Sequence, residues 1–476
     1  MAAQNMNEYQ ISSEIIRKIA EEFHCPEGKL LIGPQLSGGR SGDQVYLITV
    51  SDPPNLERAG EYILKIQKKS NKDEFDKEVN NTYSARNACN TDKIRVPTVR
   101  CFSVVSGYYV YDVAGVGAKE TATLLTQLPE KKLSRFKDFV DASVFAWSSS
   151  FSATSASLSE IIECWLGEKR LAPGSRLAER LRKFIHDELS EAWRVNNLIL
   201  PNPYYYFTCA TSEEKNPILN NVLQGPQHGD LNQTNILIQP LDKGYLYYLI
   251  DFSHYHSQSF LLFDQAYLLL DILLDIDGLL LTDWISRLRE FFLTLGDSSK
   301  LPKAFDTFGK YATSFMDGWS RFLARYPQNG KVLTIQLLCA CAAAGLNFLH
   351  KSMASESKQI FSLAFSSLAL GELMNLEVCV PPDEAGEYPE LYTGTTGKIP
   401  EIWNITDGFS QNSRYILISS CLPEHIHQDS FCTLEPIPWT AIIKVNHLLE
   451  NDLRNKALQK FRRRQGYRHI LLSKNQ

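Results

Sequence analysis

Periodic hydrophobic positions predict a strand-rich beginning and a helix-rich middle of the chain. Over residues 11–23, Ile and Phe recur at helical spacing after a pair of serines, which predicts a capped amphipathic helix. Over 29–115, short apolar runs separated by Gly and Pro predict an antiparallel sheet with one helix. Over 116–378 helical spacing prevails, and it is interrupted by short strands at 225–252.

The helix-rich region contains seven runs with helical spacing, at 121–147, 158–194, 263–275, 281–295, 303–325, 331–351 and 357–376. One stretch, Val332–Leu349, is apolar enough to raise the question of a membrane span. Its Gln336, Asn347 and many small residues favour a helix buried inside the protein instead. No membrane span is therefore expected.

The composition of the chain changes after residue 378. Residues 379–398 are rich in Pro, Gly, Glu and Thr, which is typical of a linker. Two apolar runs and a helical run then predict a C-terminal α/β extension with a basic tail, 399–476. The predicted order is an N-terminal helix (1–28), a small sheet lobe (29–115), a large helical lobe (116–378), the linker and the extension.

The overall composition is that of an ordinary globular protein. Of 476 residues, 44% are hydrophobic and 22% are charged, which argues against a wholly disordered chain and against a coiled coil. The net charge of −5 hides an uneven distribution, because residues 454–476 contain eight Lys or Arg and no acidic residue. This basic tail predicts either a solvated helix end or a surface for nucleic acid, an anionic membrane or the protein's own acidic body.

Cysteine usage and the first residues predict a cytoplasmic protein. The ten cysteines are scattered and no CxxC occurs, so reduced thiols are expected rather than a disulfide framework. The first residues lack a basic region followed by an apolar run, so no secretory signal is expected.

The strongest local signal is HGDLNQTNILI, which begins at His228. Asp230 and Asn235 lie in a loop that leads into an apolar strand, and Asp251 follows a second apolar strand. The segment PLDKG between the strands can turn the chain, so we expect a hairpin that brings Asn235 and Asp251 to the same end. An amide oxygen and a carboxylate are suitable ligands for Mg²⁺, and Asp230 can face a substrate hydroxyl.

A glycine-rich segment lies between the first two predicted strands. Glycines at such a turn let the backbone approach phosphates closely, although many glycine-rich hairpins are only turns. The segment is neither GxGxxG nor a Walker A loop. Its candidate nucleotide-binding residues are Gly38, Gly39, Arg40, Ser41 and Gly42.

Lys65 lies in a predicted half-buried strand, where its ammonium needs a phosphate or a carboxylate as partner. The following helix offers Glu74 and Glu78, which lie one turn apart on the same face. We favour Glu78 as the partner, with Glu74 as the alternative.

Together these residues resemble the aminoglycoside phosphotransferase and choline kinase families, the small-molecule branch of the protein-kinase-like fold. The similarity covers roughly residues 30–376. HGDLNQTNILI resembles the catalytic-loop motif of these families, IDF their metal-binding motif, and YYVYDVAG (108–115) the segment that joins the two lobes. The resemblance implies an α+β, bilobal fold with a small antiparallel-sheet lobe and a large helical lobe.

The resemblance also implies ATP and Mg²⁺ as cofactors and transfer of the γ-phosphoryl group to a hydroxyl. It implies that Asp230 and Asn235 are catalytic and that Asn235 and Asp251 hold the metal. Lys65, held by Glu78, would contact the phosphates under the glycine-rich segment.

In the same families the segment that joins the lobes holds the adenine ring, which implies a role for Asp112 and Val113. Asp264 takes the place of an Asp that supports the catalytic loop, so we expect a structural role for it. His-Gly-Asp and Asp-Phe-Ser, where protein kinases have His-Arg-Asp and Asp-Phe-Gly, favour the small-molecule branch.

The acceptor is not specified by the sequence. Asp271, Asp275 and Asp277 could hold a cationic substrate or form a solvated helix face, and the aromatic run at 201–207 could line a cation site or pack in the core. Two alternatives to a small-molecule kinase remain: a kinase-like enzyme that modifies a protein or nucleic acid, and a non-catalytic module that binds a nucleotide or a protein partner.

Two His-x-His pairs, at 254–256 and 425–427, lack further ligands at zinc spacing, so no zinc site is expected.

Overall fold

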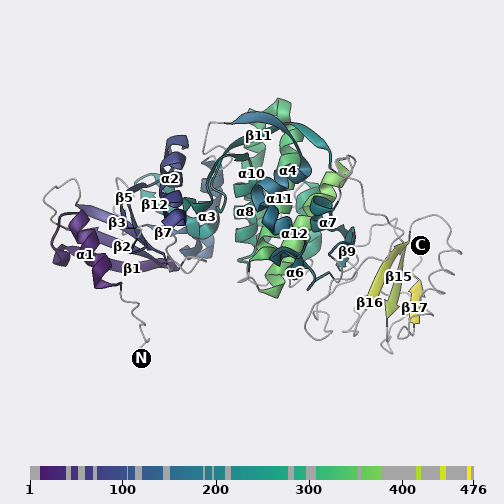
Figure 1. Cartoon of the computed structure of the whole chain (residues 1–476). Helices are drawn as coiled ribbons and strands as arrows, with labels where there is room; N and C mark the ends of the chain where they lie inside the picture. Colours follow the sequence, from purple (N-terminus) through teal and green to yellow (C-terminus); the bar gives the residue numbers. More distant parts are fainter. Residues whose placement is uncertain are drawn as a thin grey trace. The chain divides into compact units, whose positions relative to one another are not determined.

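The described residues form two compact units, and unit 1 is assembled from three parts of the chain. Figure 1 labels the helices and strands. Unit 1 comprises 1–153, 223–272 and 310–327, and unit 2 comprises 154–222, 273–309 and 328–476. The computed structural model describes residues 11–38, 44–51, 59–67, 72–89, 91–103, 105–112, 121–142, 151–185, 188–195, 198–209, 216–276, 284–295, 307–351, 355–376, 414–419, 440–445 and 469–472.

Unit 1 begins with an antiparallel sheet, as the alternating pattern predicts. Its strand order is β1-β2-β3-β6-β5, and every neighbouring pair is antiparallel. The strands are β1 (Leu30–Gly38), β2 (Gln44–Val50), β3 (Gly60–Ile66), β5 (Thr98–Ser103) and β6 (Tyr108–Asp112). The antiparallel sheet expected from residues 29–115 is thus confirmed.

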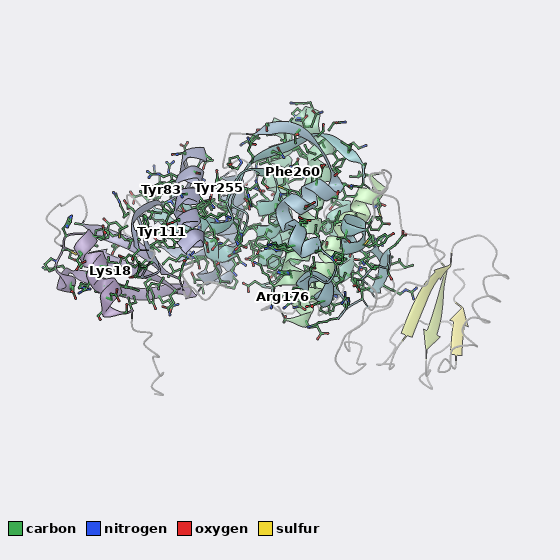
Figure 2. All side chains as sticks on the ribbon, in the orientation of Figure 1. Lys18, Tyr83, Tyr111, Arg176, Tyr255 and Phe260 are labelled. Atoms are coloured by element: carbon green, nitrogen blue, oxygen red, sulfur yellow. The ribbon has the colours of Figure 1, made fainter. Side chains whose placement is uncertain are left out.

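Helix α1 (Ser13–Glu22) packs its apolar stripe against one face of this sheet. Its N-cap is Ser12, whose side chain accepts the Ile15 amide hydrogen. The ring of Phe23 packs at a tilt against that of Tyr62, with centroids 4.8 Å apart. Lys18, labelled in Figure 2, donates to the Ser106 hydroxyl at 2.7 Å. The predicted amphipathic helix is confirmed.

The opposite face of the sheet contains alternating residues of β3 and β6. Ile63, Tyr109 and Tyr111 lie in an apolar cluster with Val79 of helix α2 (Lys72–Ala88). Since side chains alternate along a strand, Lys65 lies on the same face of β3 as Ile63. The sequence pattern therefore places this lysine under a helix rather than in solvent.

The same apolar cluster includes residues of the predicted hairpin. Strands β12 (Ile236–Leu241) and β13 (Gly244–Leu249) pair in antiparallel register, with Ile236 opposite Leu249. The expected hairpin is confirmed. Two short strands flank it, β7 (Ala122–Thr123) beside β12 and β4 (Ile94–Arg95) beside β13.

The remaining elements of unit 1 are one further strand and three helices. Strand β14 (His256–Phe260) pairs with the end of β11 (Ile218–Gln227), a strand that begins in unit 2. The helices are α3 (Pro129–Asp141), α8 (Phe263–Leu273), whose last residue belongs to unit 2, and α10 (Thr307–Arg325), whose first turn belongs to unit 2.

Unit 2 is mostly helical. Its helices are α4 (Leu158–Leu166), α5 (Glu168–Leu171), α6 (Arg176–Leu181), α7 (Pro203–Thr208), α9 (Trp284–Leu293), α11 (Gly330–His350) and α12 (Glu356–Asn375). Its strands are β8 (Ser152–Ser157), which begins in unit 1, β9 (Ala192–Val195), β10 (Leu198–Pro201), β15 (Arg414–Ser419), β16 (Thr440–Val445) and β17 (His469–Leu472).

The apolar stretch at 332–349 forms most of helix α11, a helix buried inside the protein. It is long and apolar enough to cross a membrane, but 89% of its most apolar window is buried inside the protein. The helix packs against α12, and Gly345 lets the two backbones approach, because a Cβ there would meet the Ser362 carbonyl oxygen at 2.4 Å. The expectation of a buried core helix is confirmed.

Two expectations about secondary structure are wrong in part. The helical run predicted over 158–194 ends early, because residues 192–195 form strand β9, which pairs with β10. In the C-terminal extension, β15 and β16 were expected and β17 was not, while the helix predicted over about 447–464 lies outside the described residues. The predicted boundaries of the lobes, the linker and the extension remain predictions.

Candidate functional site

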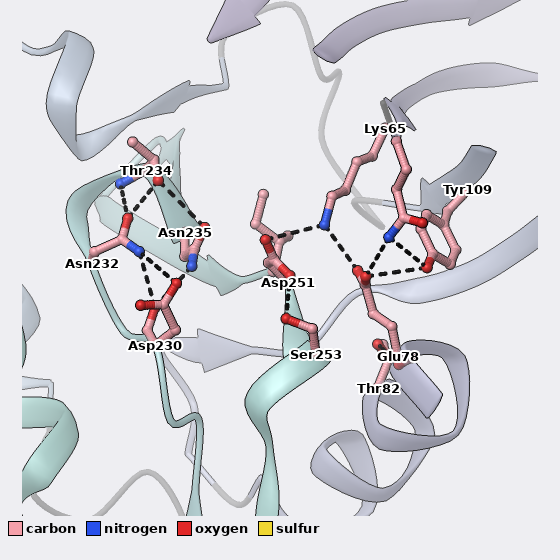
Figure 3. A network of polar contacts seen from close by, with 12 residues as sticks. Lys65, Glu78, Thr82, Tyr109, Asp230, Asn232, Thr234, Asn235, Asp251 and Ser253 are labelled. Atoms are coloured by element: carbon pink, nitrogen blue, oxygen red, sulfur yellow. Dashed lines mark hydrogen bonds and ion pairs between the residues drawn. The ribbon is translucent and has the colours of Figure 1, made fainter. Parts of the chain in front are cut away.

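A buried lysine and a buried glutamate form an ion pair in unit 1. The Lys65 ammonium on β3 lies 3.1 Å from Oε1 of Glu78 on α2, and the two residues are only 3% and 1% exposed (Figure 3). Burial of a charge costs free energy unless it is paired. Neither charged group could therefore leave the other without a cost in free energy.

Three more donors hold the Glu78 carboxylate. Tyr111 donates its hydroxyl to Oε1 at 3.0 Å, and Tyr109 and Gln67 donate to Oε2 at 3.1 and 3.0 Å. Burial raises the pKa of Glu78, an effect that the ammonium of Lys65 opposes. Burial also raises the pKa of Tyr111 well above its usual value, so this hydroxyl remains a donor. The network fixes the rotamer of Glu78 and, through it, the ammonium.

Asp251 is the second carboxylate at the Lys65 ammonium. Its Oδ2 lies 3.1 Å from the ammonium nitrogen, and its Oδ1 accepts the Ser253 hydroxyl at 3.0 Å. Burial alone would raise the pKa of Asp251, but the Lys65 ammonium, the His228 ring and the Ser253 hydroxyl together outweigh burial, and the pKa is lowered. Lys65 thus holds one carboxylate from α2 and one from the segment after β13.

The loop His228–Asn235, here called the HGD loop, is supported from α8. Asp264 is fully buried and accepts the amide hydrogens of His228 and Gly229 at 2.6 and 2.8 Å. Burial raises the pKa of Asp264, and the hydrogen bonds to its carboxylate oppose that effect. The expected supporting role of Asp264 is confirmed by these contacts.

The ring of His228 joins the HGD loop to the strand before Asp251. Its Nδ1 accepts from the Asp230 amide at 3.3 Å, so Nε2 carries the hydrogen and donates to the Ile250 carbonyl oxygen at 2.8 Å. The ring also packs on Phe252, with centroids 4.7 Å apart. The histidine is therefore a structural link between the two segments.

Asparagine side chains fix Asp230 within the loop. Asn235 donates to the Asp230 carbonyl oxygen at 2.8 Å, and Asn232 donates to the same oxygen at 3.1 Å and to the carboxylate at 3.3 Å. Thr234 in turn donates its hydroxyl to Asn232. Asp230 itself is half-buried.

The hairpin register brings Asn235 beside the segment that carries Asp251. The Ile250 amide donates to the Asn235 carbonyl oxygen at 3.0 Å, one residue before Asp251. The Asn235 amide nitrogen is bound to Asp230, so the amide oxygen is oriented by that hydrogen bond (Figure 3). One amide oxygen and one carboxylate thus lie at the same end of the hairpin, as the sequence predicts.

The donor set of Asn235 and Asp251 fits a magnesium ion that is shared with a bound phosphate. Mg²⁺ takes oxygen ligands and is usually held by one or two protein oxygens together with waters and phosphates. Within the described ranges, no group of three or more His, Cys, Asp or Glu could hold a metal ion by itself.

Asp271 anchors the centre of the HGD loop. It lies on α8, is 1% exposed, and accepts the Gln233 amide at 2.9 Å and the Gln233 side-chain amide at 3.2 Å. Of the two interpretations of the acidic residues at 271–277, the solvated face is wrong for Asp271. Asp275 is exposed, and Asp277 lies outside the described residues.

Replacing Asp271 by Ala should destabilise unit 1 by about 1–3 kcal/mol, because the buried backbone amide of Gln233 loses its acceptor and the Gln233 side chain keeps only the Asp271 carbonyl oxygen. The amide hydrogen of Gln233 should then exchange faster with solvent. Urea denaturation and hydrogen exchange measure the two effects. Asp275→Ala removes the same group at an exposed position one turn further along, and equal losses in both variants would contradict the anchoring role.

The other predicted nucleotide-binding residues are only partly described. Gly38 ends β1, whereas Gly39, Arg40, Ser41, Gly42 and Val113 lie outside the described residues. Asp112 ends β6, and its side chain pairs with Arg100 of the neighbouring strand. Glu74 lies one turn before Glu78 on α2, and it is Glu78 that meets the lysine.

Sequence reasoning missed the donors that surround Glu78. Tyr109 and Tyr111 alternate along β6, and Tyr109 lies directly opposite Lys65 in the sheet. Gln67 follows Lys65 by two residues, as expected for one face of an extended chain. The period of two in YYVYD and LKIQ is a signal that could have found them.

The other candidate features are the two His-x-His pairs and the aromatic run at 201–207. His254 and His256 belong to no metal-binding group within the described ranges, and His425 and His427 lie outside those ranges. In unit 2, Tyr204, Tyr206 and Phe207 of α7 are buried, so the aromatic run packs in the core.

Comparison with known proteins gives distant similarities. A sequence family described as "Ternary complex associated domain 9" matches residues 114–288, less than half of the chain. No curated protein matches. A protein of Thermobifida fusca described as a fructosamine-3-kinase matches with 14% identity over 76% of this chain and 100% of its own, at a TM-score of 0.37. An ethanolamine kinase of Plasmodium vivax matches with 12% identity over 74% of this chain and 84% of its own, at a TM-score of 0.30. At these values neither likeness identifies an activity.

Proposed function

We propose that this chain is an ATP- and Mg²⁺-dependent phosphotransferase of the protein-kinase-like fold. The acceptor is a hydroxyl group of a small molecule. The observation that carries the proposal is the arrangement around the Lys65 ammonium, which lies 3.1 Å from both Glu78 and Asp251. Beside it the HGD loop presents Asp230 and Asn235 at the end of a hairpin.

The fixed ammonium is suited to bind phosphate oxygens. Glu78 is saturated by Lys65 and three neutral donors, so it stays in place when a ligand arrives. A phosphate oxygen on Lys65 would compete with Oδ2 of Asp251, and that oxygen would then become available to a cation. Binding of the phosphate and binding of the cation would thus support each other.

The other residues supply positioning and a proton acceptor. Asp230 would orient the acceptor hydroxyl and take its proton, and Asn235 and Asp251 would hold the metal. Bound Mg²⁺ would neutralise negative charge on the phosphates. Gly38–Gly42 would cover the phosphates and the backbone of Asp112 and Val113 would contact adenine. These two roles rest on the family resemblance.

A cationic acceptor is a narrower part of the proposal. The chain without its basic tail, 454–476, is acidic, which favours positively charged ligands in general. Asp271 cannot serve this purpose, because Gln233 occupies its carboxylate. The basic tail remains a candidate surface for nucleic acid.

Replacing Lys65 by Met should weaken ATP binding and reduce transfer by several orders of magnitude, because it removes the phosphate ligand. A panel of hydroxyl metabolites with ATP labelled in the γ-phosphate, assayed with Mg²⁺ and with a chelator, measures the transfer. Lys93→Met is the matched control, since Lys93 is a half-exposed lysine of unit 1 paired with Asp138. Chelation should abolish the transfer, and added Mg²⁺ should restore it.

The same assay separates the two alternatives. Label on a protein or nucleic acid and on no metabolite would favour a macromolecular acceptor. Tight ATP binding without transfer or hydrolysis would favour a non-catalytic module. Equal activity of the Lys65 and Lys93 variants would contradict the proposed site.

A further inference from the structure

Arginine side chains gather at the last turn of helix α11, in unit 2. Arg170 of α5 donates to the Asn347 side-chain oxygen at 2.8 Å. Arg180 of α6 donates to the Lys351 carbonyl oxygen. Asn347 lies one turn before His350, and Lys351 is the residue after His350. Each of the two arginines therefore bonds to a residue close to this histidine in the helix.

A third arginine lies on the same face of α6. Arg176 precedes Arg180 by one helical turn and is exposed, and it is labelled in Figure 2. Within the part of the chain that the structure describes, Arg176 and Arg180 form no ion pair. The charge of Glu179, on the same helix, raises the pKa of Arg182, and no carboxylate is among the groups that shift the pKa of His350. The positive charge of α6 on this face is therefore not neutralised by carboxylates of the described residues.

His350 lies among these arginines with an unsatisfied polar atom. Its Nδ1 is buried and has no hydrogen-bond partner among the described residues. Burial and the charges of Arg170, Arg176 and Arg180 lower the pKa of His350, so its ring is neutral at pH 7. Buried polar atoms in folded proteins are nearly always paired, and an orphaned one needs an explanation.

The helix dipole does not account for the whole cluster. The C-terminus of a helix carries about half a negative charge, which favours one basic side chain in the last turn. Three guanidinium groups far exceed that charge. Arg180 already satisfies a terminal carbonyl oxygen, which leaves Arg176 without a role in capping.

We propose that Arg170, Arg176, Arg180 and Nδ1 of His350 form a binding site for the phosphate group of a small molecule, here called the arginine site. Guanidinium groups match phosphate oxygens with paired donors, and several of them can share one dianion. The neutral imidazole adds a donor to the anion and satisfies its own buried nitrogen. The site lies wholly in unit 2 and is independent of the proposed transfer reaction.

Calorimetric titration of the full chain tests the arginine site with inorganic phosphate and with glycerol 3-phosphate as probes. Arg176→Gln should weaken binding by about tenfold, the effect of losing one hydrogen bond to a charged group. Lys169→Gln is the matched control, because it removes one positive charge from an exposed position next to Arg170. This control should bind within about twofold of the unaltered chain. Tighter binding of one probe tells whether a free phosphate or a phosphate ester is the natural ligand.

Two further measurements place the bound phosphate. The imidazole resonance of His350, assigned with a His350→Gln variant, should shift when phosphate is added. Lys65→Met should leave this shift unchanged, since Lys65 belongs to unit 1. An absent shift, equal losses in the Arg176 and Lys169 variants, or phosphate binding that depends on Lys65 would each overturn the proposal.

Discussion

Replacing Asp230 by Asn should reduce phosphoryl transfer about 100- to 10,000-fold, the usual contribution of a general base. Asparagine has the same shape and keeps an oxygen for the Asn232 side chain, which donates to Asp230 at 3.3 Å. It has no carboxylate to take the proton of the acceptor. The affinity for ATP should therefore be unchanged while kcat falls, and calorimetry together with steady-state kinetics measures the two quantities.

The hairpin beside the HGD loop offers a matched control for this variant. Asp242 is exposed at the hairpin turn, and Asp242→Asn makes the same chemical change at a place remote from the site. Its kcat should equal that of the unaltered chain. If Asp230→Asn retained full transfer activity, the proposed role of this carboxylate would be wrong.

Replacing Gly229 by Ala should lower the free energy of unfolding by about 2–4 kcal/mol. Gly229 has a φ of +81°, and a Cβ built there would lie 2.1 Å from the His254 carbonyl oxygen. Backbone atoms cannot move aside as a flexible side chain does, so the HGD loop must shift. The shift would strain both hydrogen bonds to Asp264 and displace Asp230. Urea denaturation measures the loss.

Gly244→Ala separates the two causes of lost stability, the clash of the added Cβ and the positive φ of the backbone. Gly244 also has a positive φ, +97°, and nothing lies within 4 Å of a Cβ built there. This control should lose only about 1 kcal/mol, from the strained backbone conformation alone. Phosphoryl transfer should fall in the Gly229 variant and persist in the Gly244 variant. Equal stability of the two variants would contradict the close approach to His254.

The pairing of Asn235 with the segment of Asp251 could be predicted because it depends on local signals. Two apolar strands around a turn define a hairpin, and the register follows from the turn. Lys65 could be assigned to a buried face by its apolar neighbours. The choice between Glu74 and Glu78 was harder, since residues one turn apart share a helix face, and only the position of α2 along the sheet decides which of them meets the lysine.

The contact between Asp271 and the HGD loop could not be predicted from one sequence. Asp271 lies in the apolar run FDQAYLLLDIL, which indicates burial and hence a need for donors. Its stronger partner is the backbone amide of Gln233, at 2.9 Å against 3.2 Å for the side-chain amide, and no side-chain pattern reports on a backbone amide. For β9 and β10, the Asn-Asn pair after Val195 was a turn signal that the helical spacing before it obscured.

Because unit 1 is assembled from three parts of the chain, it cannot fold completely until late in synthesis on the ribosome. Lys65 and Glu78 leave the ribosome together, whereas Asp251 is synthesised roughly 10 to 40 s later at ordinary rates of translation. During this interval the sheet lacks the hairpin whose Leu237, Tyr248 and Ile250 share its apolar cluster. A nascent chain of this protein therefore exposes the apolar face of the sheet that the hairpin later covers. A chaperone that binds apolar surfaces could bind this face before residue 272 emerges.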